Sequence, residues 1–99
     1  MKVYFRTNFS QKIGLGHFSR CSRLANFFSK KNFNCKIYVD NNHKLNNYFK
    51  NNKKINIKNL YKKNQKYISP VKDANIFKKM IDKNCIVIVD DYRLDYKWE

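Results

Sequence analysis

The chain has few residues that interrupt secondary structure and few that carry negative charge. Among its 99 residues are two glycines, one proline and seven acidic residues. No apolar run approaches the ~18 residues of a membrane span, and the amino terminus is too short and too charged for a signal peptide. The three cysteines form no CxxC pair, which argues against a disulfide framework and against a zinc site. We therefore expect one cytoplasmic domain, residues 1–99, with reduced thiols.

Positive charge is abundant, and its make-up limits what it implies. The 22 basic residues give a net charge of +15, and eighteen of them are lysines. Nucleic-acid binders usually show a stripe of arginines with stacking aromatic residues. Here the lysines are spread along a chain that is also rich in asparagine and isoleucine, a composition typical of A/T-rich coding sequences. A specific nucleic-acid partner is not predicted, and a basic module that contacts polyanions is kept as an alternative.

Apolar segments alternate in type along the chain, and 42% of the residues are hydrophobic, enough to form a core. Periodicity predicts strands over 2–6, 35–39, 55–57 and 85–90, and helices over 17–31, 43–52 and 72–83. This alternation predicts an α/β fold, a Rossmann-like parallel sheet of about four strands with flanking helices. Ligands of such sheets bind beyond the carboxyl ends of the strands. The loops 7–16 and 90–95 are therefore the candidate site.

The first of these loops contains both glycines of the chain. Gly14 and Gly16 stand directly before a predicted helix, whose free N–H groups attract an anion such as a phosphate or diphosphate. Arg20 follows one helical turn later, where it could pair with the phosphate or face solvent. The equal alternative for the glycines is a tight turn between strand and helix.

His17 stands at the start of the same helix. The helix dipole disfavours the imidazolium form there, so we expect a neutral ring. A neutral imidazole beside a phosphate site suits a general base that activates water. The alternative is a histidine that caps the helix or packs against it.

The last loop offers carboxylates and an aromatic hydroxyl. Asp90 ends the most apolar strand, and it would lie near the first loop if the first and last strands are neighbours. Its carboxylate could position a sugar hydroxyl, bind a divalent ion or stabilise its own loop. No metal site is predicted, because no histidine or third acid is close in sequence. Tyr92 could contact a sugar ring or pack at the rim of the fold.

A nicotinamide dinucleotide site is a further possibility, because Asp40 ends the second strand as a ribose-binding acid would. Two features argue against it. Ser19 stands where the third glycine of the fingerprint belongs, and His17 stands where the pyrophosphate and the helix packing require small residues.

Two blocks of sequence resemble a known enzyme family. Residues 6–25 read RTNFSQKIGLGHFSRCSRLA, and residues 89–99 read VDDYRLDYKWE. They resemble the amino-terminal signature of the UDP-sugar hydrolases of pseudaminic acid synthesis and the family's Val-Asp-His-Tyr-Gly-Leu-Asp-x-x-Trp-Glu stretch. The family belongs to a wider group of proteins with the two-domain GT-B glycosyltransferase fold. Three positions depart from its pattern: Asn8 replaces Asp, Asp91 replaces His and Arg93 replaces Gly.

The resemblance implies a hydrolase that releases UDP from UDP-2,4-diacetamido-2,4,6-trideoxy-β-L-altropyranose without a metal or other cofactor. It places the base for the attacking water at His17 and a residue of the sugar site at Tyr92. We expect Gly14, Gly16 and Arg20 near the substrate, and Asn8, Ser10 and Asp90 as residues that could position the loop or the sugar.

The same resemblance implies a second domain. GT-B proteins bind their nucleotide mainly through a carboxyl-terminal domain, so we expect the chain to represent the amino-terminal half, with the other half in cis or on another chain. By itself the chain is expected to carry the base but to have little affinity for UDP and no activity. A glycosyltransferase, in which an acceptor hydroxyl takes the place of water, is the alternative enzyme.

Overall fold

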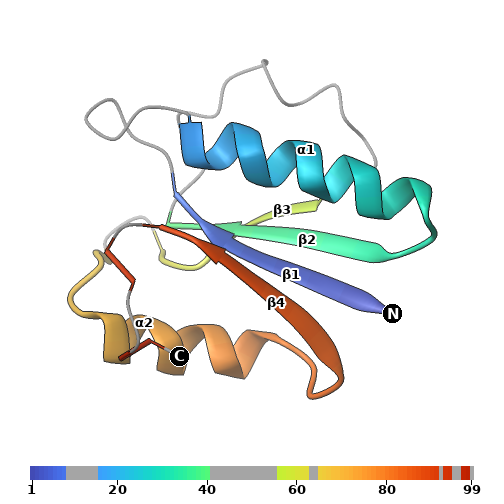
Figure 1. Ribbon diagram of the computed structural model, residues 1–99. Helices are drawn as coiled ribbons and strands as arrows, with labels where there is room; N and C mark the ends of the chain where they lie inside the picture. Colours follow the sequence, from blue (N-terminus) through green and yellow to red (C-terminus); the bar gives the residue numbers. More distant parts are fainter. Residues whose placement is uncertain (9–15, 41–55, 63–64, 92, 95–96, 99) are drawn as a thin grey trace.

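The computed structural model describes residues 1–8, 16–40, 56–62, 65–91, 93–94 and 97–98. The elements of this part are β1 (Lys2–Thr7), α1 (Gly16–Lys30), β2 (Asn34–Val39), β3 (Asn56–Asn59), α2 (Pro70–Met80) and β4 (Cys85–Asp90). The four strands form one parallel sheet in the order β3-β2-β1-β4 (Figure 1). This confirms the predicted Rossmann-like α/β fold. The helix predicted over 43–52 lies outside the described residues.

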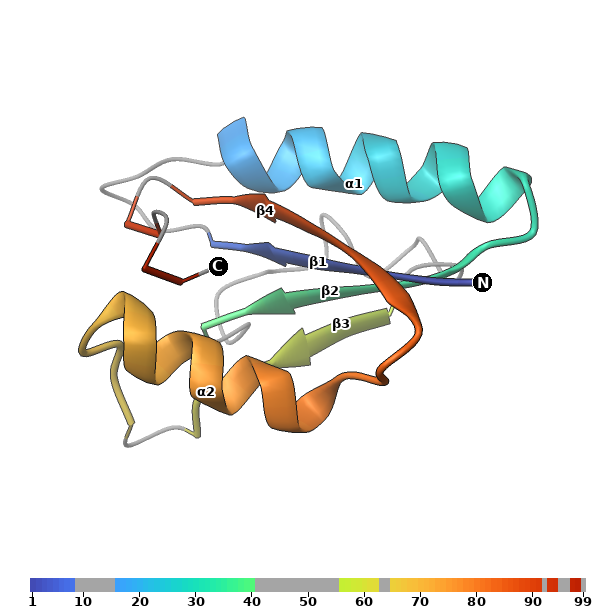
Figure 2. The same ribbon diagram turned by 60° about the horizontal axis from the view of Figure 1, so that its bottom comes forward.

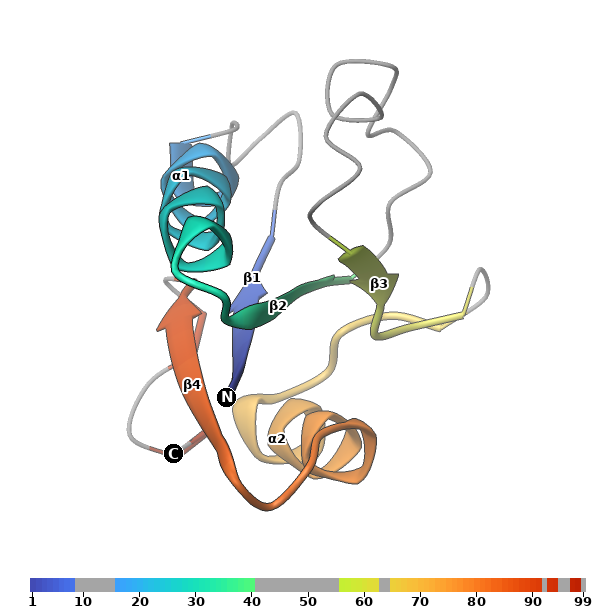
Figure 3. The same ribbon diagram turned by 90° about the vertical axis from the view of Figure 1, so that its right-hand side faces the viewer.

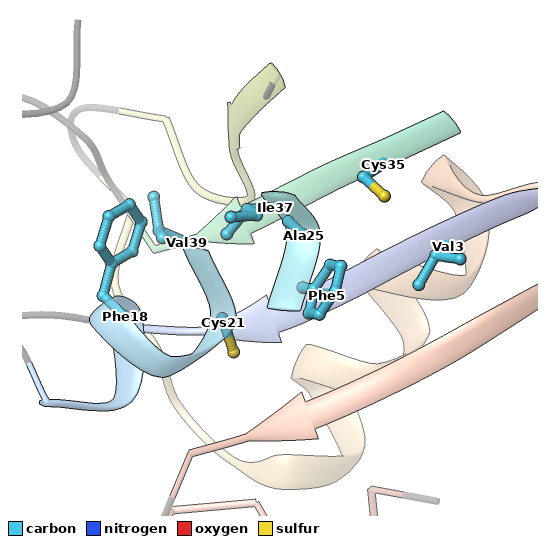
Figure 4. Close-up of a cluster of buried hydrophobic side chains, with 8 residues drawn as sticks. All are labelled: Val3, Phe5, Phe18, Cys21, Ala25, Cys35, Ile37 and Val39. Atoms are coloured by element: carbon cyan, nitrogen blue, oxygen red, sulfur yellow. The ribbon is translucent and has the colours of Figure 1, made fainter. Parts of the chain in front are cut away.

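The sheet lies between the two helices, with α1 on one face and α2 on the other (Figure 2). Successive side chains of a strand point to opposite faces, so each strand contributes to two cores. On the α1 face, Val3 and Phe5 of β1 and Ile37 of β2 pack against Phe18 and Cys21 of α1 (Figure 4). These side chains are all buried, as the spacing of the apolar residues requires.

The opposite face carries larger and more polar side chains. Tyr4 and Tyr38 come from the central strands, Phe77 comes from α2, and Trp98 comes from the segment after β4. The rings of Tyr38 and Phe77 meet edge to face with their centroids 5.2 Å apart, and Trp98 packs against Phe77 at 5.2 Å. The segment after β4 is thereby tied to the second helix.

The bounds of α2 differ from the predicted 72–83 at both ends. Ser69 caps the helix with an extended backbone and accepts a hydrogen bond from the Lys72 N–H, and Pro70 fills the first helical position, where no N–H is needed. The helix ends at Met80 because Ile81 is already extended. The prediction ran one turn too far because Ile81 continues the apolar spacing of Ala74 and Phe77. Ile81 does pack into the same core as these residues, but from outside the helix.

The register of the sheet decides which residues meet at its carboxyl edge. β1 pairs with β4 so that Thr7 is opposite Asp90, and β1 pairs with β2 so that Arg6 is opposite Tyr38. The ends of these strands and the start of α1 therefore lie at one edge of the sheet (Figure 1). Within the described ranges, no helix is long and apolar enough to cross a membrane.

Candidate active site

Asp90 links the last strand to the start of the first helix. Its side chain receives contacts from both His17 and Arg20 of α1, and its backbone carbonyl accepts a hydrogen bond of 2.8 Å from the Thr7 hydroxyl. The sequence predicted that Asp90 would lie near the first loop if the first and last strands were neighbours. They are neighbours, because β1 pairs with β4. Two segments that are 73 residues apart in the chain thus form one polar cluster.

The contact between His17 and Asp90 bears on which ring nitrogen carries the proton. His17 Nδ1 lies 2.6 Å from Asp90 Oδ1. An ionised carboxylate only accepts hydrogen bonds, so the proton of this bond is on Nδ1. In the neutral ring the lone pair is then on Nε2, the nitrogen on the other side of the ring from Asp90. A carboxylate that fixes the tautomer and the orientation of a histidine in this way is the arrangement of a general base.

Arg20 completes the cluster. Its Nε and Nη2 donate to the two oxygens of Asp90 at 2.9 and 3.0 Å, and Nη2 is also 3.0 Å from His17 Nδ1. The hydrogen bond from Arg20 lowers the pKa of Asp90, burial opposes this, and His17 lowers the pKa further. Asp90 is therefore ionised at neutral pH.

The cluster is open to solvent. The side chains of His17 and Asp90 are about one quarter exposed, at 27% and 23%, and Arg20 is 56% exposed. Among the residues that the structure describes, a side chain added at Gly16 would meet no atom within 4 Å. Packing against these residues therefore does not require glycine at the start of α1. The role of Gly16 in binding stays a prediction.

A second, larger ionic cluster lies at the same edge on the α2 face, and the sequence did not reveal it. Arg6 donates to both oxygens of Asp73 at 3.0 and 2.7 Å, and the side chains of both residues are fully buried. Asp73 also accepts hydrogen bonds from the Tyr61 hydroxyl at 2.7 Å and from Trp98 Nε1 at 2.8 Å. The sequence offered one signal for this cluster: a single charged residue inside an otherwise apolar pattern, Arg6 in the first strand and Asp73 in the helix α2.

Asp40 extends this buried cluster to the segment after β4. Arg6 Nη2 donates to Asp40 Oδ1 at 2.6 Å, and Arg93 donates to both Asp40 oxygens at 2.9 and 3.0 Å. Burial by itself would raise the pKa of Asp40, but Arg93 and Arg6 outweigh it and the pKa is lowered. Both carboxylate oxygens are engaged by guanidinium groups. Asp40 is therefore not arranged to bind a ribose, in line with the sequence argument against a dinucleotide site.

Arg93 and Asp91 are bonded to each other. Arg93 Nε and Nη2 donate to the two Asp91 oxygens at 3.0 and 2.6 Å, and the Arg93 guanidinium lies 4.3 Å from the centre of the Tyr67 ring. These are the two positions of the second block that depart from the family pattern. Asp91 and Arg93 thus stand in place of the family's His and Gly as a bonded pair. Through Asp40, Arg93 holds this segment against the end of β2.

Of the other predicted site residues, Asn8 has a structural contact. Its side-chain oxygen accepts the Asp40 N–H at 3.4 Å, and the residue is buried. Ser10, Gly14 and Tyr92 lie outside the described residues. In the part of the chain that the structure describes, no group of three or more His, Cys, Asp and Glu could hold a metal ion.

Fold and site together define a class: an all-parallel, Rossmann-like α/β domain with a carboxylate-held histidine at the carboxyl edge of its sheet. No protein-family model, no curated protein and no solved structure matches the chain. The resemblance of the two sequence blocks to UDP-sugar hydrolases therefore stays a hypothesis, and the site is interpreted from its own geometry.

Proposed function

We propose that the chain is the amino-terminal part of a nucleotide-sugar hydrolase that releases UDP from UDP-2,4-diacetamido-2,4,6-trideoxy-β-L-altropyranose. The observation that carries the proposal is the 2.6 Å contact between His17 Nδ1 and Asp90 Oδ1. It involves two residues from the two blocks that resemble this family, which are far apart in the sequence. The contact gives the histidine of the first block the partner that a general base needs.

His17 activates the attacking water in this proposal. Asp90 holds the proton on Nδ1, so Nε2 accepts a proton from the water as its oxygen attacks the anomeric carbon. The bond between the sugar and the diphosphate breaks, its electron pair leaves with UDP, and the free sugar carries the new hydroxyl. The imidazolium formed in this step is stabilised by the Asp90 carboxylate.

Arg20 supports the departure of UDP. Its guanidinium is more than half exposed and belongs to the same cluster as His17, so it lies where a diphosphate at the start of α1 would develop negative charge. A positive group beside the leaving phosphate stabilises the transition state. The Gly14 to Gly16 segment contributes N–H groups near the diphosphate, and Tyr92 contributes to the sugar side.

The test is UDP release from the altropyranose donor by the full-length protein, which includes the second domain that the resemblance implies, and by its His17→Asn variant, which keeps a polar side chain but cannot act as a base. We expect turnover to fall by about 10²–10⁴, the usual contribution of a general base. His43→Asn, which changes the other histidine of the chain, serves as the control and should release UDP at the wild-type rate. Undiminished release by His17→Asn contradicts the proposal.

A further inference from the structure

The carboxyl end of β1 contacts both ionic clusters at this edge of the sheet. Arg6 and Thr7 are consecutive residues of a strand, so their side chains point to opposite faces. Arg6 bonds Asp73 of α2, whereas Thr7 alternates with Val3 and Phe5, which pack on the α1 face. Figure 3 shows α1 and α2 on the two sides of β1. The end of this strand therefore lies between the buried cluster and the proposed catalytic cluster.

The hydroxyl of Thr7 bonds the end of β4. Thr7 is fully buried, and its hydroxyl donates to the backbone carbonyl of Asp90 at 2.8 Å. The two residues are also the last partners in the register of β1 with β4. Asp90 in turn contacts His17 through its side chain. Thr7 thus holds the backbone of the residue whose carboxylate orients the histidine.

The guanidinium of Arg6 anchors Thr7 from the α2 face. Arg6 Nη1 donates to the backbone carbonyl of Thr7 at 2.7 Å, while Nε and Nη2 donate to Asp73. Arg6 is fully buried, so this anchor lies inside the fold. A catalytic group keeps its geometry where hydrogen bonds and packing fix the residues that support it. The contacts of Arg6 and Thr7 give Asp90 such a support.

We propose that Thr7 is a positioning residue of the candidate site, whose hydroxyl holds the end of β4 so that the Asp90 carboxylate reaches His17. The catalytic consequence rests on the proposed function, because it takes His17 as the base. The geometric consequence does not, because the contact of His17 with Asp90 can be followed without a substrate. Thr7→Val removes the hydroxyl from a side chain of nearly the same shape, and the Asp90 carbonyl loses this donor.

The first measurement is nitrogen-15 NMR of the His17 ring in the full-length protein, at a pH at which the ring is neutral. Its signals are assigned by their loss in His17→Asn. Asp90 contacts Nδ1, so we expect the proton of the wild-type ring on Nδ1. In Thr7→Val we expect a larger share of the form with the proton on Nε2. Thr7→Ser keeps the hydroxyl and loses one methyl group, so it should retain the wild-type signals.

The second measurement is UDP release by the full-length protein. Thr7 is buried and supports the base, so Thr7→Val should lower kcat by about ten-fold and leave KM unchanged. Thr7→Ser should restore the rate.

Tyr61→Phe is the matched control for both measurements. It also removes a hydroxyl hydrogen bond, the 2.7 Å bond to Asp73 in the buried cluster. We expect it to lower the stability of the fold, as Thr7→Val does, and to leave the His17 signals and kcat as in the wild type. A variant that only weakens the fold is thereby distinguished from one that displaces Asp90.

Three results would overturn the proposal. The first is a folded Thr7→Val protein with unchanged His17 signals. The second is an equal change of these signals in Thr7→Ser, which would assign the effect to the methyl group. The third is rapid exchange of the Thr7 hydroxyl proton with water in the wild type, a measurement that does not require Thr7→Val to fold. A wild-type protein that releases no UDP would contradict the proposed function, and the His17 signals would still test the role of Thr7.

Discussion

Two ionic clusters lie at the same edge of the sheet, on its opposite faces, and they differ in burial. In the first, Arg6 and Asp73 are fully buried, and their charged atoms are engaged by protein groups. In the second, His17 and Asp90 are about one quarter exposed and Arg20 is more than half exposed. Both contain a carboxylate bound by an arginine through two oxygens.

The difference in burial separates structure from chemistry. A buried ion pair cannot reach a substrate, and removing one partner leaves an uncompensated charge in the core. An exposed cluster contributes little to stability, and its groups can contact a ligand. We therefore assign the Arg6 cluster to the stability of the fold and the His17 cluster to the proposed reaction. Variants of the Arg6 cluster should therefore lose stability, and variants of the His17 cluster should lose activity.

The largest expected loss of stability follows from breaking the buried pair. Asp73→Asn removes the charge that faces Arg6 and alters the acceptor for Tyr61 and Trp98. We expect the free energy of unfolding to fall by about 3–5 kcal/mol, measured by denaturant titration. Asp82→Asn, which breaks an exposed ion pair with Lys2, should stay close to the wild type. Equal stabilities for the two variants would contradict the assignment.

A smaller effect is expected where the buried cluster reaches the segment after β4. Burial alone would raise the pKa of Asp40, and Arg93 and Arg6 lower it. A carboxyl with a lowered pKa in the folded state stabilises the protein above its unfolded value near 4, and this contribution is lost as the pH falls through the folded value. Arg93→Gln should cost about 1.5–3 kcal/mol at neutral pH, the scale of a charged hydrogen bond.

The same variant should change the acid limb of the stability curve. Without Arg93 the pKa of Asp40 in the folded state is less lowered, so the loss of its stabilisation begins at a higher pH than in the wild type. The free energy of unfolding, measured between pH 7 and acid, checks this. Two curves that differ by the same amount at every pH would show that Arg93 acts only by packing.

The sequence was sufficient for the fold because its signals are local. The four strands and two of the helices were predicted within a few residues, and the apolar run of β4 correctly indicated a parallel sheet. The largest difference in bounds was at the carboxyl end of α2, predicted at residue 83 and observed at Met80. There Ile81 continues the apolar pattern although its backbone is extended.

The site was only partly predictable, because its contacts are between distant segments. The loops and the residues His17, Arg20 and Asp90 were identified from their positions at strand and helix ends. Their mutual contacts depend on the pairing of β1 with β4. The buried pair of Arg6 and Asp73 was missed because both residues occur singly in apolar segments. Only the packing of α2 on the sheet brings them together.

The variant Asp90→Asn provides the most direct test of the account. Its stability can be compared with that of Asp73→Asn, and its UDP release with that of His17→Asn. Asp90→Asn keeps the shape of the side chain and removes the charge that orients His17. We predict that UDP release falls by about 10²-fold, the scale of a misplaced catalytic group. The free energy of unfolding should fall by less than about 1 kcal/mol. Unchanged release, or a loss of stability as large as that of Asp73→Asn, would contradict the account.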